Sequence, residues 1–360
     1  MAEDERLILA VNPGGTSTKL GLFRGIRPVF EKSIRHLPEE LEKFGTTLDQ
    51  LNYRKKMILD TLEEEGTPLD RLAAVVGRGG AFKPMESGTY EVNEKLVEDI
   101  IDGSTLQADH PSNLGALLAW EIARKAGCKP YIVDPVCVDE MIDEARLSGL
   151  PQLPRTSLSH ALNIRMVAYK AAEILGKPFN RINLVVLHLG SGISVNAIRK
   201  GRMIDTSQAN DGGPFSPQRV GALPTTGLAR MCLSGKYTWP EMKVMLLKKG
   251  GLYAYTGTDH VGEALERAAK GDEICSLTLR AMVYQIVKEA GAMAAALAGD
   301  VDAVVITGGI ALNEQINEKI SESLRFLGNI LVFPGEKELE ALVRGVLRVL
   351  DGVEEVKEYR

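Results

Sequence analysis

The chain has few cysteines and few aromatic residues, and it lacks a long uninterrupted hydrophobic run. Its four cysteines form no Cys-X-X-Cys pair, so neither a disulfide framework nor a zinc site is indicated, and reduced thiols in a cytoplasmic protein are the simplest account. The longest apolar helical stretch, residues 281–298, is interrupted by Lys288 and Glu289, which favours a buried helix over a membrane span. The acidic start MAEDERLILAV has the wrong sign for a signal or transit peptide.

Basic runs are absent as well. The formal net charge is −5 and aromatic residues make up 5% of the chain, which argues against nucleic acid as the main partner. The phosphate-binding motifs GxxxxGK[ST] and GxGxxG followed by VAIK are also missing, so a phosphate-binding function must rest on a different fold. With 360 residues, 44% of them hydrophobic, the chain is expected to form two domains.

Two glycine- and hydroxyl-rich turns, far apart in the chain, carry the most information. Apolar residues 7–11 lead into the first turn (residues 12–19), and apolar residues 184–189 lead into the second turn (residues 190–192). Each pattern predicts a β-hairpin whose turn can hold phosphate, because glycines let backbone N–H groups approach an anion and neutral side chains add donors. The candidate residues are Asn12, Gly14, Thr16, Ser17, Thr18 and Lys19 in the first turn and Gly190, Ser191 and Gly192 in the second.

A third segment, residues 304–311, ends an apolar strand in a glycine pair. Glycines there would let a flat nucleoside lie against the backbone, at the carboxyl end of a strand, where open α/β sheets place ligands. We therefore expect Gly308, Gly309 and the following Asn313 to bind nucleotide.

Strand-like and helical segments alternate along the chain, which predicts an α/β protein. The expected strands are residues 7–11, 73–77, 130–134, 184–189, 303–307 and 330–333, and the expected helices are 47–65, 93–102, 113–127, 160–175, 276–298 and 313–325. Because the hairpin with its glycine turn recurs, two similar domains facing a central cleft are expected. The boundary is placed at residues 148–154, where two prolines rule out a continuing helix.

Several motifs occur in the order of a known family. They are AVNPGGTSTKLGLF (10–23), GRGG (77–80), DHPSN (109–113), VDPV (133–136), SHALN (159–163), HLGSGIS (188–194), DTSQANDGGPFSPQRVG (205–221) and TGGIALNE (307–314). On these motifs the chain resembles the acetate and butyrate kinase family, within the sugar kinase, Hsp70 and actin group, and it is more similar to the butyrate kinase branch. The resemblance implies two duplicated ribonuclease H-like (actin-like ATPase) domains. Residues 1–154 with 335–360 would form the acyl and phosphate side, and residues 155–334 the nucleotide-binding side.

The resemblance also implies the roles of individual catalytic residues. Arg78 and Arg219 would hold the carboxylate and phosphoryl oxygens, since a guanidinium binds oxyanions bidentately and keeps its charge. Asn12 would orient the phosphate, and His188 would donate a hydrogen bond to it. From local sequence alone, each arginine is an ordinary loop residue and His188 a buried core histidine.

Two acidic positions would hold Mg²⁺ by the same resemblance. Asp134 follows an apolar strand, and Glu338 is the preferred second acid, with Glu336 as an open alternative. A carboxylate that caps a turn or helix is the competing interpretation of each. Asp205 is a secondary candidate for supporting the metal or a loop.

The acyl group would lie near His110, another family position. The expected acyl-binding residues are Gly80, His110, Gly212 and Gly213, and glycine at 79–80 and 212–213 would leave room for a chain longer than acetate. Each buried methylene would contribute about 0.8 kcal/mol. Where acetate kinases carry a histidine that assists the transition state, this chain has Thr156, and Arg155 is the candidate for the missing positive charge. His36 and His260 match no family position and are expected at the surface, and His160 is expected to be structural.

A phosphotransferase with a carboxyl group as acceptor is the function that the resemblance implies. The γ-phosphoryl group of Mg·ATP would pass to butyrate or a related short- or branched-chain acid, giving an acyl phosphate and ADP, and the reaction would be reversible. No general base is required, because a carboxylate with a pKa of about 4 is already ionised at pH 7. The alternatives are an acetate or propionate kinase of the same family, a sugar kinase, and a non-catalytic actin- or Hsp70-like nucleotide switch. A homodimer or a higher homo-oligomer is expected, since family members form at least dimers.

Overall fold

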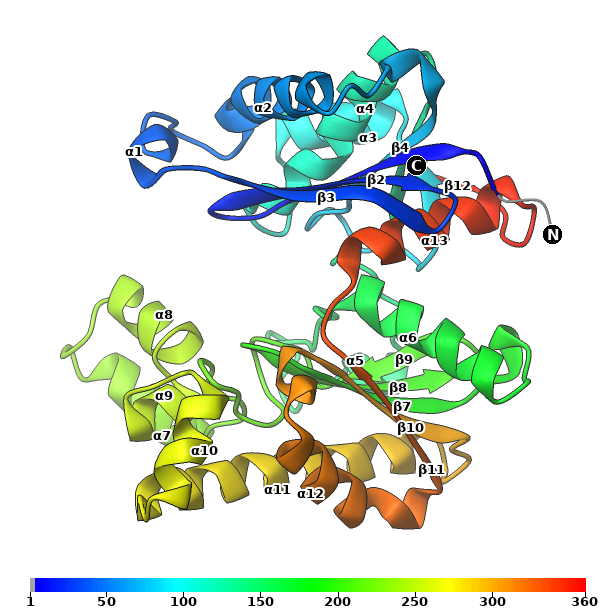
Figure 1. The fold of residues 1–360 in the computed structure, drawn as a ribbon. Coiled ribbons are helices and arrows are strands. Elements are labelled where there is room, and N and C mark those ends of the chain that lie inside the picture. Colours follow the sequence, from blue (N-terminus) through cyan, green and yellow to red (C-terminus); the bar gives the residue numbers. More distant parts are fainter. Residues whose placement is uncertain (1–3) are drawn as a thin grey trace. The chain divides into compact units, whose positions relative to one another are not determined.

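A computed structural model describes residues 4–360, and the chain divides into two compact units (Figure 1). The first unit holds the chain up to Val138 together with Lys337–Arg360, and the second unit is Asp139–Glu336. Residues 148–154, where the sequence analysis places the boundary, lie inside the second unit. The chain returns to the first unit at Lys337, two residues after the position expected from the sequence.

The first unit is built on a mixed sheet. Its strands are β1 (Leu7–Pro13), β2 (Ser17–Arg24), β3 (Arg27–Arg35), β4 (Leu72–Arg78), β5 (Thr89–Glu91), β6 (Lys129–Val133) and β12 (Lys357–Glu358), in the order β12-β5-β6-β4-β1-β2-β3. β1 pairs antiparallel with β2 and parallel with β4, which pairs parallel with β6. β1 is buried along its whole length, as the apolar run at 7–11 predicts.

Helices cover both faces of this sheet (Figure 1). They are α1 (Pro38–Leu41), α2 (Leu51–Glu64), α3 (Glu94–Asp102), α4 (Leu114–Ala126) and α13 (Glu338–Leu350). α4 packs on β1, β4 and β6 from one side, and α13 packs on the same strands from the other. The helix and strand backbones touch where Gly77 meets Gly115, because a Cβ atom at Gly77 would overlap the carbonyl group of Gly115.

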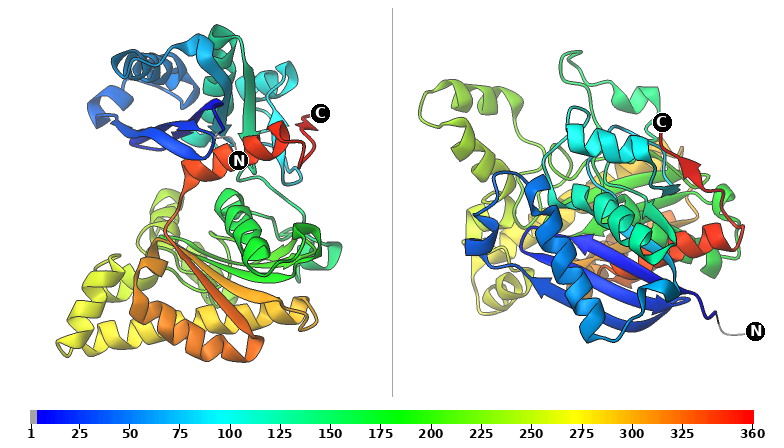
Figure 2. Two further views of the ribbon diagram at one scale, coloured as in Figure 1. Left: turned by 45° about the vertical axis from the view of Figure 1, so that its right-hand side comes forward. Right: turned by 90° about the horizontal axis from the view of Figure 1, so that it is seen from above.

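The second unit has a smaller sheet. Its strands are β7 (Leu184–Leu189), β8 (Ile193–Arg199), β9 (Arg202–Thr206), β10 (Ala303–Gly308) and β11 (Asn329–Pro334), in the order β11-β10-β7-β8-β9. Its helices are α5 (Asp143–Arg146), α6 (Ala161–Ile174), α7 (Thr225–Leu233), α8 (Trp239–Leu247), α9 (Gly251–Thr256), α10 (Val261–Ala269), α11 (Glu273–Ala296) and α12 (Glu314–Leu324). Figure 2 shows α6 on one face of this sheet and α11 with α12 on the other.

The two sheets repeat one pattern. Five strands of the first sheet, β6-β4-β1-β2-β3, correspond in order to the second sheet, β11-β10-β7-β8-β9. In both sheets the first three strands run parallel to one another, and each of the last two pairs antiparallel with the strand before it. The prediction of a duplicated α/β fold with two glycine-turn hairpins is confirmed. The helices α7 to α10, between Thr225 and Ala269, were not predicted. None of the helices within residues 4–360 is both long enough and apolar enough to span a bilayer.

Candidate active site

Charged and amide side chains gather where β1 enters the first turn. Asn12 is buried and donates through Nδ2 to Glu338 Oε2 at 2.5 Å. Lys19, which faces Asn12 across the hairpin, places Nζ 3.5 Å from the same oxygen. Arg78, at the end of β4, forms an ion pair with Glu338 Oε1. Four of the predicted site residues therefore lie together in the first unit, and the first residue of α13 is fixed at the first turn.

The tip of the first turn is open to solvent. Gly14 N–H donates to the Ser17 carbonyl at 2.7 Å, which closes the turn, while Gly15 and Thr16 are exposed. A Cβ atom at Gly15 would meet nothing within 4 Å. The exposed tip can therefore present the Gly15 backbone and the Thr16 hydroxyl to an anion, whereas the N–H of Gly14 is already used to close the turn. Phosphate binding at Gly14, Thr16 and Ser17 remains a prediction.

Thr18 departs from that prediction. Its side chain is fully buried, and Oγ1 lies 2.8 Å from His36 Nε2 and 3.0 Å from Arg54 Nη1, away from the open side of the turn. The side-chain alternation of β2 turns this residue inward. The same contact corrects the expectation for His36, which is 3% exposed and not a surface residue.

The glycines after Arg78 are tightly packed on the side where a side chain would lie. A Cβ atom at Gly79 would overlap Pro135, and one at Gly80 would lie 2.6 Å from the Cα atom of Asn113. Asn113 Oδ1 accepts from the Ala81 N–H at 2.8 Å, so this close approach is part of the turn. The prediction that Gly80 opens an acyl pocket is therefore wrong, because packing requires glycine there.

His110 caps a short helical turn. Its Nδ1 lies 2.8 Å from Ser112 Oγ and accepts from the Ser112 N–H at 3.2 Å. Burial and the positive charge of Arg78 lower the pKa of His110 below its ordinary value, so the ring is neutral at pH 7. Its contact with an acyl group remains a prediction.

The two predicted metal ligands are both engaged by the protein. Asp134 is buried with φ of 40°, its Oδ1 accepts from the Gly88 N–H at 2.7 Å, and its own N–H donates to the Gly88 carbonyl at 3.0 Å. Within residues 4–360, no group of three or more His, Cys, Asp or Glu side chains is arranged to hold a metal ion. Asp134 and Glu338 therefore fit Mg²⁺ only as one or two carboxylates that supplement water and substrate phosphates.

The second turn is tighter than the first. Gly190 N–H donates to the Gly192 carbonyl at 3.0 Å, and Ser191 is exposed at the tip. Ser216 Oγ donates to the Ser191 carbonyl at 2.5 Å. The turn is thus tied to the loop that carries Arg219, whose N–H donates to the same Ser216 hydroxyl at 3.1 Å.

Arg219 lies against the second turn. A Cβ atom at Gly192 would overlap the guanidinium group, which explains the glycine, and Arg219 Nη1 donates to the Ala209 carbonyl at 2.8 Å. Among residues 4–360, no carboxylate lies within the 4.0 Å of an ion pair with Arg219. Burial lowers the pKa of Arg219. A cation that the protein does not neutralise is therefore placed beside the turn, as its predicted role requires.

His188, in β7, belongs to a buried network. Its Nδ1 lies 3.0 Å from Asn163 Nδ2, and its Nε2 lies 3.0 Å from Glu336 Oε1. Asn163 also donates to Thr307 Oγ1 at 3.1 Å, and the His188 ring stacks on His160 with centroids 3.7 Å apart. Because the Asn163 amide nitrogen can only donate, a neutral His188 carries its proton on Nε2, which lies near Glu336 but makes no hydrogen bond with it. Donation from His188 to phosphate remains a prediction.

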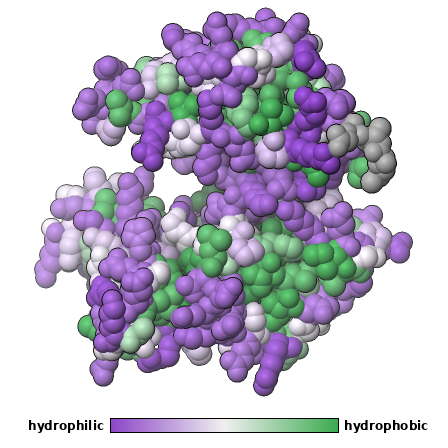
Figure 3. Space-filling view, in the orientation of Figure 1, coloured by the Kyte–Doolittle hydropathy of each residue, from purple (hydrophilic) through white to green (hydrophobic). Residues whose placement is uncertain are grey.

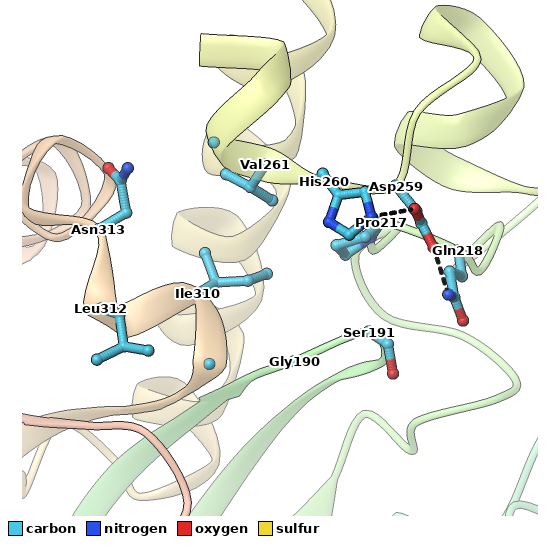
Figure 4. Close-up of a pocket in the computed structure, with 12 residues that line it drawn as sticks. Gly190, Ser191, Pro217, Gln218, Asp259, His260, Val261, Ile310, Leu312 and Asn313 are labelled. Atoms are coloured by element: carbon cyan, nitrogen blue, oxygen red, sulfur yellow. Dashed lines mark hydrogen bonds and ion pairs between the residues drawn. The ribbon is translucent and has the colours of Figure 1, made fainter. Parts of the chain in front are cut away.

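A cavity of about 480 Å³ opens beside the second turn (Figure 4). Gln218 Nε2 donates to Asp259 Oδ2 at 2.6 Å on one side, and Ile310 and Leu312 form an apolar surface on the other. An apolar face opposite polar groups suits a base and a ribose. Among the residues predicted to bind nucleotide, those that line this cavity are Gly190, Ser191, Gly309 and Asn313.

Two other predicted nucleotide residues do not line the cavity. Gly192 packs against Arg219, and Gly308 has φ of 95° where a Cβ atom would overlap the Leu189 carbonyl. Asn313, although it lines the cavity, also caps α12 by accepting from the Ile316 N–H at 3.1 Å. These residues shape the backbone around the cavity.

A larger cavity of about 700 Å³ lies elsewhere in the second unit. Gly212 lines it, as predicted for an acyl pocket, together with the apolar side chains of Leu153, Val220, Leu223, Leu228 and Leu246. Gly213 does not; with φ of 60°, it packs so that a Cβ atom would lie 2.7 Å from Ser207 Oγ.

Arg155 also borders this cavity, but its charge is already paired. Its Nη2 donates to Asp205 Oδ1 at 2.9 Å and to the Thr206 carbonyl at 2.7 Å, and Nη1 donates to the Ala145 carbonyl at 2.6 Å. Through this bond with Arg155, Asp205 supports a loop. The idea that Arg155 supplies a free positive charge gains no support from this geometry.

Comparison with known proteins identifies the family. The pattern of the acetokinase family matches residues 155–338. Butyrate kinase 1 of Clostridium acetobutylicum is 44% identical over 354 residues, which cover 98% of this chain and 99% of that protein. This chain belongs to the acetokinase family. It is also similar to a probable butyrate kinase of Clostridium botulinum, at 43% identity over 98% of this chain and 99% of that protein.

Solved structures share the fold of this chain. An acetate kinase from Porphyromonas gingivalis matches with a TM-score of 0.76 and 20% identity, covering 96% of this chain and all of that one. A propionate kinase from Francisella tularensis matches with a TM-score of 0.74 and 20% identity, over 94% of this chain and 98% of that one. The predicted actin-like ATPase fold is confirmed.

Sequence reasoning missed part of the candidate site. Gln218, Ile310 and Leu312 fall inside motifs that carried the resemblance, so their positions gave a signal that was not used. Asp259 and His260 lie outside every motif, and only the fold brings them to the cavity. The side chain of His260 is exposed, as expected.

Proposed function

We propose that this protein transfers the γ-phosphoryl group of ATP to a short- or branched-chain carboxylate, with butyrate as the leading candidate. The products are an acyl phosphate and ADP, and the reverse reaction uses the same site. The near full-length likeness to butyrate kinase 1 carries this proposal most directly. Two hairpin turns, one beside Arg78 and one beside Arg219, support it.

The nucleotide binds in the second unit in this proposal. The 480 Å³ cavity takes the nucleoside, and the second turn beside it meets the phosphate chain through backbone N–H groups. The first turn and Asn12 orient the transferring phosphoryl group. Asp134 and Glu338 would hold Mg²⁺ largely through water and phosphate oxygens, and the ion would neutralise charge on the transferring group.

Arg78 and Arg219 hold the acyl and phosphoryl oxygens. Glu338 now pairs with Arg78, so binding of an oxyanion exchanges one carboxylate partner for another. An oxygen of the ionised acid attacks phosphorus in line, the bond from phosphorus to the β-phosphate oxygen breaks, and ADP leaves with that electron pair. No proton has to be removed from the acid at pH 7.

The 700 Å³ cavity is the proposed place of the acyl chain. Its apolar lining favours burial of hydrocarbon, at about 0.8 kcal/mol for each methylene. Gly212 leaves this wall open, whereas Gly80 plays no part. The volume exceeds what acetate fills, which supports a preference for four or five carbons.

A homo-oligomer in the cytoplasm completes the proposal. Ile274, Leu277 and Tyr284 are exposed on one side of α11, with exposed fractions of 59%, 61% and 67%. The edge strand β11 is only partly buried, and Figure 3 shows hydrophobic side chains reaching the surface of the second unit. Apolar surface of this extent supports self-association through the second unit.

Hydroxylamine trapping of the acyl phosphate tests the activity. The protein is given Mg·ATP and, in turn, acetate, propionate, butyrate, isobutyrate and valerate, with Arg78→Ala as the control. We expect hydroxamate that peaks at four or five carbons and is lost in the control. A peak at acetate would support the proposed reaction but contradict the preference for four or five carbons. ATP binding without hydroxamate from any acid would favour a nucleotide switch or a sugar kinase.

A further inference from the structure

A fully buried arginine lies under the first turn. Arg54, in α2, is 0% exposed, and its guanidinium reaches the backbone of the turn from inside the first unit. Nη2 lies 3.4 Å from the Gly15 carbonyl, and Nη1 lies 3.5 Å from the Ser17 carbonyl and 3.0 Å from Thr18 Oγ1. Nε and Nη2 both donate to Gln50 Oε1, at 3.0 and 2.8 Å.

Every one of these acceptors is neutral. They are an amide oxygen, a hydroxyl and two backbone carbonyls, and within residues 4–360 no carboxylate lies within 4.0 Å of Arg54. Burial lowers the pKa of Arg54. A buried charge without a partner of opposite sign destabilises a fold strongly, so folded proteins rarely keep one without a compensating function.

The side chains next to Arg54 form a chain of hydrogen bonds in which the donor and the acceptor of each bond can be assigned. Tyr53 Oη donates to Glu40 Oε2 at 2.7 Å, because a carboxylate can only accept. His36 Nδ1, 3.3 Å from the same Tyr53 oxygen, therefore donates to it, and a neutral His36 is left to accept at Nε2 from the Thr18 hydroxyl at 2.8 Å. The pKa of His36 is lowered to about 4 by burial and by the charge of Arg54, which keeps the ring neutral. The Thr18 oxygen thus presents its lone pairs to Arg54.

We propose that Arg54 is a positioning residue for the first turn, whose unneutralised charge attracts the transferring phosphoryl group and whose hydrogen bonds fix the turn around it. The anion bound at the turn supplies the negative charge that no carboxylate near Arg54 provides. Because Gln50 is neutral, it binds the guanidinium without neutralising it, and the charge of Arg54 can act on the phosphoryl group. This inference rests on the proposed function, because it takes the first turn as the site of the transferring phosphoryl group.

Gln50→Glu tests the inference with the smallest change. Glutamate keeps the shape and both acceptor contacts and adds a carboxylate beside Arg54, so the charge is neutralised while the turn is still held. Affinities for ATP and ADP are measured by calorimetry, with thermal melting beside them. Gln315→Glu, on the exposed side of α12, makes the same change of net charge in the second unit and serves as the matched control.

We expect Gln50→Glu to melt at a higher temperature than the wild type and to lose on the order of tenfold in ATP affinity relative to ADP. ADP binding should stay near the wild-type value, because ADP lacks the group that the first turn holds. Arg54→Met should show a larger loss of the same ratio, and Arg54→Lys should restore part of it. The control should match the wild type in both nucleotides.

An unchanged ratio of ATP to ADP affinity in a stabilised Gln50→Glu protein would overturn the proposal and leave Arg54 with a purely structural role. Equal losses for ATP and ADP would overturn it as well, since the effect would not lie at the transferring group. Both readouts are independent of the acid substrate. A wild type that binds ATP but makes no hydroxamate would therefore remove the proposed reaction without deciding the role of Arg54.

Discussion

In the first unit the glycine turn follows β1, and in the second unit the equivalent turn follows β7, which holds the same place in its sheet. The two turns are supported by different elements. Arg54 of α2 approaches the first turn from the buried side, whereas Arg219 approaches the second from the loop at 208–221. Neither arginine has a carboxylate partner among residues 4–360.

This difference shows what the duplicated fold supplies and what it does not. The shared strands place a glycine turn at the same edge of each sheet. The charge comes from segments that the two units do not share. The acids also differ, since Glu338 contacts Arg78 beside the first turn, while Glu336 contacts His188 beside the second. Substitutions that affect one turn and spare the other test this division of work.

The largest effect is expected from Arg78→Ala. Removal of the guanidinium takes away a charge that stabilises the transferring phosphoryl group, and turnover should fall on the order of 10³-fold. The measurement is hydroxamate formation with butyrate and Mg·ATP. ADP binding, which we assign to the second turn, should be preserved. A comparable loss of ADP affinity would contradict the division between the units.

A second prediction concerns the nucleotide cavity. Gly309→Val adds a side chain where a Cβ atom meets nothing within 4 Å, so the fold should tolerate it while the cavity loses room. We expect dissociation constants for ATP and ADP to rise together, on the order of tenfold. Gly291→Val, at an equally open position on α11, is the control for a β-branched side chain. Unaltered nucleotide affinity in the Gly309 variant would place the nucleoside elsewhere.

A third prediction narrows the acyl cavity. Leu223 lines the 700 Å³ cavity and is partly exposed, so Leu223→Trp should fill space without disturbing the core. We expect the ratio of kcat/KM for valerate to that for acetate to fall by about tenfold, because longer chains lose the most contact. Nucleotide affinities should not change. A uniform decrease for all acids would indicate a distortion of the site instead of a change in its size.

The smallest effect is a pH dependence of stability that arises from His36. Its pKa is lowered from 6.5 to about 4 in the folded protein, so the unfolded chain binds the proton more readily and stability falls as pH decreases from about 6.5 to about 4. The loss should be about 3 kcal/mol. Urea unfolding of the wild type and of His36→Gln between pH 7 and pH 4 measures it. Parallel curves for the two proteins would show that His36 is not the source.

The sequence was sufficient to predict the repeated strands and the glycine turn of each unit. Alternating apolar runs and glycine turns predict β1, β7 and β10, because strand burial and turn geometry are local properties. Arg78 and Glu338 could be assigned only through the resemblance. The contacts of Glu338 with Asn12 and with Arg78 follow from the return of α13 to the first sheet.

Other features depend on tertiary packing and could not be read locally. Thr18 and Ser17 look alike in the sequence, yet the inward face of β2 takes Thr18 to His36 and Arg54. Gly80 was interpreted as open space, but the contact with Asn113 shows that a glycine can mark close packing as well. Arg54, in the first turn of α2, belongs to no motif at all.

Isotope transfer from the acid to phosphate tests the central claim most directly. Butyrate labelled with ¹⁸O in both carboxyl oxygens is incubated with Mg·ATP and hydroxylamine, and the released inorganic phosphate is analysed by mass spectrometry. If a carboxylate oxygen attacks phosphorus, hydroxylamine displaces phosphate from the acyl carbon, and each hydroxamate is matched by one phosphate that carries one ¹⁸O atom. Phosphate without the label, formed at the rate of ATP consumption, would mean that water is the acceptor and would contradict the account.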